Sequence, residues 1–150
     1  MSIFRKISWR AVIFGGLADV GGTNVVGIIF IAYIASNYGL SAVPSEQFAT
    51  AINNVIFSDP VLYCVSFFIG SVFSIFGGYV AAWIAKRNEL LNGGFSASLC
   101  VLIGLYSIFL GLNPSIPVAF EILSIPLSPA LGVLGGYLRK KQINLHKNGT

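Results

Sequence analysis

The sequence predicts an all-α integral membrane protein, a bundle of four membrane-spanning helices with both chain ends in the cytoplasm. Three observations favour it: 55% of the 150 residues are hydrophobic, only 9% are charged, and four long segments are almost free of charge. A soluble domain has about a quarter of its residues charged, so this composition cannot supply a surface suited to water. We therefore expect the lipid bilayer to be the solvent, which excludes a soluble enzyme and a free nucleic-acid-binding protein.

The first two spans are separated by the longest polar segment of the chain. Crossing about 30 Å of hydrocarbon takes roughly 20 apolar residues, and residues 11–36 satisfy this although Asp19 interrupts them. Residues 61–85 form the second predicted span. Asp59 and Pro60 precede it, and they predict a helix N-cap followed by a first-turn proline.

The last two spans form the second half of what we expect to be a single transmembrane domain. The third covers residues 90–112 and the fourth covers residues 117–138. Pro126 and Pro129 lie inside the fourth, and we expect them to kink it. Residues 139–150 then form a basic cytoplasmic tail.

The distribution of Lys and Arg predicts the orientation of the four spans. Cytoplasmic loops retain basic residues, and all nine Lys and Arg side chains fall on one side of the predicted bundle. These are Arg5, Lys6, Arg10, Lys86, Arg87, Arg139, Lys140, Lys141 and Lys147. We interpret this charge as a topology signal in preference to a patch for anionic lipid or nucleic acid, and we place both termini in the cytoplasm.

The first outer loop, residues 37–59, is the main segment outside the membrane. Between Ser45 and Phe57 its apolar residues recur at helical spacing, which predicts a short amphipathic helix on the outer face. Those apolar residues are Phe48, Ile52, Val55 and Ile56. A lid over the end of the bundle is favoured over a helix that binds a partner.

Small residues recur every three or four positions in each span, which predicts close helix packing in lipid. The glycines expected at these contacts are Gly15, Gly22, Gly70, Gly78, Gly93, Gly104 and Gly135. Large side chains, including Phe67, are expected to face lipid or another subunit. Glycine pairs at the same end of every span are also compatible with a duplicated helical hairpin, although independent selection for packing is the favoured explanation. Cys64 and Cys100 are interpreted as packing residues, with no metal or cofactor expected.

Asp19 is the one acidic residue predicted to lie deep in the bilayer. It follows Arg10 by nine residues, which is roughly 13 Å along a helix. A carboxyl at that depth costs roughly 2.5 to 3.5 kcal/mol on insertion scales, so it should face protein or a cavity. A structural hydrogen bond to a neighbouring helix or to Thr23 is the favoured interpretation. The other is an ion or solute site with Thr23 and Asn24, at which the glycines between them locally open the helix.

Glu121 is the second acidic residue inside a span, and it lies close to the outer surface. An acid is favoured near a helix N-terminus, so capping is the preferred role, with a polar vestibule as the alternative. The only histidine, His146, lies in the predicted tail. No catalytic triad or carboxylate pair is therefore predicted, and we do not expect an enzyme.

The segment from Gly77 to Gly93 carries a resemblance to a protein family. It contains Gly-Gly-Tyr-x-Ala-Ala, then Lys86, Arg87, Glu89 and Leu90, and ends at the glycine that opens the third span. This resembles small bacterial four-span membrane proteins of uncharacterised function, and the first span, Ala11 to Gly22, is similar to the start of the same family. The resemblance implies a bacterial inner membrane and a four-helix fold. It implies no activity.

Two functions follow as hypotheses, and the sequence favours the first. The first is a non-enzymatic structural or accessory subunit of another membrane protein, or a homo-oligomeric bundle, because the small-residue faces leave little internal space. The second is a small transporter or channel with a polar site at Asp19, Thr23 and Asn24, with Glu121 as a further candidate. A wet pocket that reaches Asp19 and opens to one side would favour the second hypothesis, whereas a carboxyl sealed among Gly and Ser residues of neighbouring helices would favour the first.

Overall fold

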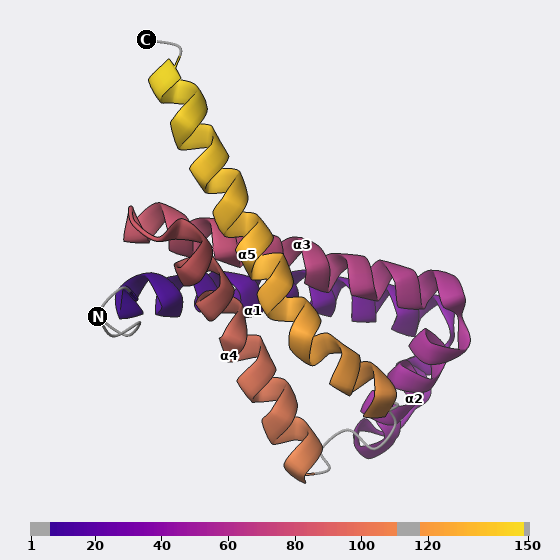
Figure 1. Cartoon of the computed structure of the whole chain (residues 1–150). Coiled ribbons are helices and arrows are strands. Elements are labelled where there is room, and N and C mark those ends of the chain that lie inside the picture. Colours follow the sequence, from indigo (N-terminus) through magenta and orange to yellow (C-terminus); the bar gives the residue numbers. More distant parts are fainter. Residues whose placement is uncertain (1–6, 111–117, 149–150) are drawn as a thin grey trace.

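The structure is a computed structural model that describes residues 7–110 and 118–148, with the side chains at positions 107, 108, 118–121, 123, 124, 147 and 148 left out of the description. Within these residues the protein consists of helices and turns, without a strand (Figure 1). The helices are α1 (Trp9–Asn37), α2 (Ser45–Ser58), α3 (Pro60–Ala85), α4 (Glu89–Leu110) and α5 (Val118–Asn148). A short 3-10 turn, Leu40–Ala42, precedes α2.

Three helical segments are long and apolar enough to cross a membrane. They are Trp9–Asn37, Pro60–Ala85 and Glu89–Tyr106, and they correspond to the first three predicted spans. The prediction of a helical membrane protein is therefore confirmed at this level. The region of the fourth predicted span lies in α5, which passes through Pro126 and Pro129 and continues to Asn148. The predicted tail is thus helical as far as Asn148.

The start of α3 has the predicted cap. Asp59 Oδ1 accepts hydrogen bonds from the backbone amides of Val61 at 2.8 Å and Leu62 at 3.4 Å. Pro60 occupies the first helical position, where its missing N–H costs nothing. Tyr38, which follows the end of α1, donates its hydroxyl to Asp59 Oδ2 at 3.1 Å. The cap therefore also ties the end of α1 to the start of α3.

The amphipathic helix α2 closes the end of the α1 and α3 pair. Its Ile52 is 3% exposed and packs with Ile34 of α1 and Leu62 of α3, which are 0% and 8% exposed. Phe48, Val55 and Ile56 of α2 are partly buried around this cluster. The apolar face predicted from the sequence therefore packs on the ends of α1 and α3, whereas a lid over the whole bundle is not formed by the described contacts.

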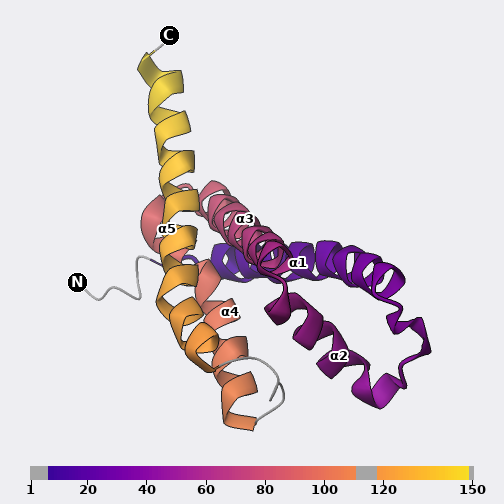
Figure 2. The same cartoon turned by 90° about the vertical axis from the view of Figure 1, so that its right-hand side faces the viewer.

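The four long helices meet in a layer of glycines, defined here as Gly15, Gly77, Gly78, Gly93, Gly132, Gly135 and Gly136. A Cβ on Gly15 would stand 2.6 Å from the carbonyl oxygen of Gly77, and one on Gly93 would stand 3.1 Å from the Cα of Gly136. Side chains would not fit at these contacts, so the backbones touch directly. Away from this glycine layer, α4 and the first half of α5 diverge from the antiparallel pair of α1 and α3 (Figures 1 and 2).

Asn92 fixes the turn between α3 and α4 beside this layer. Its side chain is 0% exposed, and its amide nitrogen donates to the carbonyls of Arg87 at 3.0 Å and Asn88 at 3.1 Å. Lys86 and Asn88 have positive φ angles, of 53° and 46°, which turn the chain sharply. Asn92 Oδ1 also accepts from the backbone amide of Ser8 at 2.8 Å. One side chain therefore joins the starts of α1 and α4.

Candidate functional site

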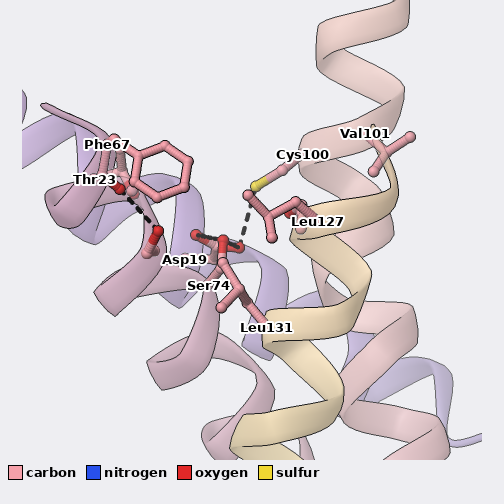
Figure 3. A pocket seen from close by; sticks show the side chains of 11 residues that line it. Asp19, Thr23, Phe67, Ser74, Cys100, Val101, Leu127 and Leu131 are labelled. Atoms are coloured by element: carbon pink, nitrogen blue, oxygen red, sulfur yellow. Dashed lines mark hydrogen bonds between the residues drawn. The ribbon is translucent and has the colours of Figure 1, made fainter. Parts of the chain in front are cut away.

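A pocket of about 260 Å³ lies where the two helix pairs begin to diverge. Its described lining comes from all four long helices: Asp19 and Thr23 on α1, Phe67, Gly70, Ser71 and Ser74 on α3, Cys100 and Val101 on α4, and Leu127, Ser128 and Leu131 on α5. Figure 3 shows Thr23 and Phe67 on one side and Val101 and Leu127 on the other, with Asp19 and Ser74 between them. The exposed surface of the pocket is mostly apolar.

Asp19 lies in the wall of this pocket and is 1% exposed. The Ser74 hydroxyl donates to its two carboxylate oxygens at 3.2 and 3.4 Å, and the Cys100 thiol donates to Oδ2 at 3.2 Å (Figure 3). Three helices thus meet at one carboxylate. None of these hydrogen bonds comes from a basic side chain in the described part of the chain. The charge of an ionised Asp19 would therefore be left without a described counter-charge.

The other predicted site residues divide into three cases. Thr23 lines the pocket one turn from Asp19, as its spacing predicts. Asn24 is exposed, and its side-chain amide donates to the carbonyl of Val20 on its own helix at 2.7 Å. The structure therefore does not bring Asn24 to the site. Glu121 lies in α5, but its side chain is outside the described residues.

The helix around Asp19 is unbroken. α1 is continuous from Trp9 to Asn37 through Gly21 and Gly22, so the local opening considered from the sequence does not occur. The carboxyl also bonds to neighbouring helices and not to Thr23. Backbone N–H and C=O groups in lipid must form their hydrogen bonds within the helix. Glycine residues alone are therefore not enough to open α1.

Five of the seven predicted packing glycines have neighbours where a side chain would stand. Gly15, Gly78, Gly93 and Gly135 belong to the glycine layer, and Gly22 faces the Phe73 ring of α3. No described atom lies within 4 Å of a Cβ placed on Gly70 or Gly104. Gly70 instead lines the pocket, because the helices have separated at its depth. The small-residue pattern therefore extends along each helix further than the close packing does.

Three residues of the site were given other roles by the sequence. From the sequence, Cys100 is interpreted as a packing residue and Phe67 as a side chain facing lipid, and Ser74 belongs to the small residues that recur every four positions in the second span. Phe67 is 47% exposed and also forms part of the pocket wall. Ser74 and Cys100 are separated from Asp19 by 55 and 81 residues, so no local pattern identifies them as its partners. The one feature of the sequence that could have identified them is that Ser and Cys, on helix faces made of small residues, have side chains able to donate a hydrogen bond to a buried carboxyl.

The described residues contain no group of three or more His, Cys, Asp and Glu side chains that could hold a metal ion. No protein-family model, curated protein or solved structure matches this chain. The class of protein is therefore defined by the chain alone: a helical protein with three helices able to cross a membrane, in which one carboxyl borders a pocket lined by four helices.

Proposed function

We propose that this protein is a four-span membrane protein that binds a small solute beside Asp19 and acts as a carrier or channel. The observation that carries the proposal is the pocket itself: it is lined from four helices and has the deep acidic residue in its wall. An acid inside a membrane bundle is costly and marks solute, ion or proton pathways by default. If the helices had been selected only for close packing, a cavity beside Asp19, the residue whose burial in the membrane costs the most free energy, would serve no purpose.

The proposed topology has four spans with both termini in the cytoplasm of a bacterial cell. α5 supplies the fourth span, and the starts of α1 and α4 lie at the same end as the end of α3 and residues 135–139 of α5, which then extends beyond the other helices (Figure 1). Arg10, Lys86, Arg87 and Arg139 therefore gather near the glycine layer, as cytoplasmic residues do. On this topology the pocket opens toward the outer half of the membrane.

The topology is tested by single cysteines in a chain whose Cys64 and Cys100 are replaced by serine. Ser45→Cys should react with a membrane-impermeant maleimide on intact cells, whereas His146→Cys should react only after the membrane is opened. Labelling of both positions on intact cells would contradict the proposed orientation.

The solute-binding function is tested through Cys100, whose thiol lies against Asp19 at the pocket. In a Cys64→Ser variant, Cys100 is the only thiol, and a small neutral reagent, methyl methanethiosulfonate, reports whether solutes reach it. We expect modification in native membranes. The matched control is Ser45→Cys in a chain whose Cys64 and Cys100 are replaced by serine, because Ser45 is exposed at the start of α2, outside the candidate spans. Modification of this control without modification of Cys100, both in the natural background and in an Asp19→Asn chain that lacks the carboxylate beside the thiol, would mean that the pocket is closed and that the carrier proposal is wrong.

The alternative remains a non-enzymatic accessory subunit or homo-oligomer. One observation favours it: α1 has a face of large exposed apolar side chains, which face either lipid or another subunit. They include Ile13, Phe14, Leu17, Val25, Ile28 and Ile29. Proteins that co-purify with the chain in mild detergent, together with an unreactive Cys100, would support this second function.

A further inference from the structure

We propose that the pocket beside Asp19 selects a small organic monocation: an apolar body that carries one ammonium group. The inference rests on the proposed function and specifies its substrate class. Four features of the described residues carry it, namely the charge at the pocket, the character of its walls, its size and the direction in which it is open.

The charge at the pocket favours a cation. Asp19 is the one acidic residue among the described lining residues, and no Lys, Arg or His is among them. Its hydrogen bonds come from a hydroxyl and a thiol, which leave the charge of a carboxylate uncompensated. Coulomb interactions are weakly screened in such surroundings. An anion in the pocket would meet only repulsion, whereas a monocation would supply the missing counter-charge.

The walls favour an apolar body around that charge. Phe67, Val101, Leu127 and Leu131 line the cavity with carbon, and Figure 3 shows Phe67 on one side of the carboxyl and Val101 and Leu127 on the other. The face of an aromatic ring such as Phe67 also attracts an ammonium group. Because Asp19 is only 1% exposed and is covered by Ser74 and Cys100, a ligand in the pocket meets its charge through the pocket wall and without direct contact with its oxygens. A partly hydrophobic amine matches both features, because its apolar body contacts the carbon-lined walls and its ammonium group is attracted by the carboxylate.

The size and the opening set limits on the ligand and its route. A volume of about 260 Å³ lies just below the usual range of about 300 to 1,000 Å³ for small-molecule sites, so the ligand is small. The glycine layer seals one end, because Gly15 and Gly77 touch backbone to backbone next to Asp19. Thr23 and Phe67 extend the pocket away from that layer. The cation therefore enters from the end at which the helices diverge.

The test compares charged and neutral thiol reagents at Cys100 in the Cys64→Ser variant. The reagents are methyl, 2-aminoethyl and 2-sulfonatoethyl methanethiosulfonate, which are neutral, cationic and anionic near pH 7. We expect the cationic reagent to exceed the anionic one by at least about tenfold, after each rate is divided by that of the same reagent at the introduced thiol of the Ser45→Cys control. Asp19→Asn, which keeps an oxygen acceptor for Ser74, should reduce this preference to about onefold.

A ligand of the proposed class provides the second readout. Benzylammonium should slow modification of Cys100 by the neutral reagent, and benzyl alcohol, which has a similar shape without the charge, should not. Protection by both compounds, or by neither, would overturn the assignment of a cation, as would equal normalised rates for the charged reagents. In those cases the neutral reagent still modifies Cys100, so the proposed function stands. If no reagent reaches Cys100, both proposals fail together.

Discussion

The hydroxyl of Ser74 on α3 lies 3.2 and 3.4 Å from the two carboxylate oxygens of Asp19 on α1. Both side chains are buried, so this contact links two antiparallel helices through polar groups that lipid cannot solvate. It also holds the carboxyl at the edge of the pocket. Its contribution to folding can be separated from the function proposed for Asp19.

Replacing Ser74 by Ala removes this interhelical donor. Hydrogen bonds between membrane helices contribute about 0.6 kcal/mol on average and at most about 1.7 kcal/mol, so we expect the free energy of unfolding to fall by about 1 kcal/mol. The measurement is unfolding by sodium dodecyl sulfate in mixed micelles, followed by circular dichroism. Ser71→Ala is the matched control, because the Ser71 hydroxyl bonds to the carbonyl of Phe67 on its own helix at 2.8 Å. An equal loss in both variants would count against an interhelical role for Ser74.

Gly135 allows the contact between α5 and α3 to be tested. A Cβ at this position would overlap the carbonyl oxygen of Ile75 and stand 2.7 Å from the backbone nitrogen of Tyr79. Backbone cannot move aside as a side chain can, so Gly135→Ala should lower the free energy of unfolding by about 1 to 3 kcal/mol or more. Gly27→Ala, where no described atom lies within 4 Å, should leave it unchanged or slightly higher. Comparable losses at the two positions would contradict the packing described for α5.

Asn92 provides a third test, at the turn between α3 and α4. Asn92→Ala leaves the amide of Ser8 and the carbonyls of Arg87 and Asn88 without this partner, and it should cost about 1 to 3 kcal/mol of stability. Hydrogen exchange at the start of α1 should rise at the same time, because the Ser8 bond joins α1 to α4. Asn24→Ala is the control, since Asn24 is exposed and bonds within its own helix. Unchanged exchange at Ser8 in the Asn92 variant would argue against this link.

Asp59 predicts how stability depends on pH. The backbone amide of Val61, with smaller contributions from Leu62 and Tyr38, lowers the pKa of Asp59 below its ordinary value of 3.8. A pKa that is lower in the folded state means that ionised Asp59 stabilises the fold above that ordinary value. This stabilisation is lost as the pH falls through the lowered pKa.

Thermal denaturation in detergent between about pH 7 and about pH 2 measures this dependence. Asp59→Asn keeps a side-chain acceptor for the helix N-terminus but cannot ionise, so its melting temperature should fall less steeply on acidification than that of the natural chain. Tyr38→Phe removes one donor to Asp59 and should weaken the dependence slightly. A melting temperature that falls equally steeply with and without the Asp59 carboxyl would assign the effect to other groups.

Much of the fold could be predicted from local sequence. The predicted second span, 61–85, and the observed α3, Pro60–Ala85, agree within one residue, because Asp59 and Pro60 define a helix start by their own chemistry. The amphipathic helix could also be predicted from local sequence, because the helical spacing of its apolar residues can be recognised within one short segment. The continuation of α5 to Asn148 was not predicted, because a basic segment beyond the last apolar turn carries no stop signal and was interpreted as a tail.

By itself the sequence determined the solvent of this protein, its helical spans and the one carboxyl that needs a buried partner. Composition and periodicity suffice for these, since they depend on residues close together in the chain. Only the tertiary structure decided that Ser74 and Cys100 are the partners of Asp19, that Gly135 packs whereas Gly70 borders a pocket, and that Asn24 faces away. These depend on where helices distant in sequence cross and separate. Because small residues recur along each helix, many crossing points between two helices are possible. Which of them occurs depends on the contacts that all the helices make at the same time.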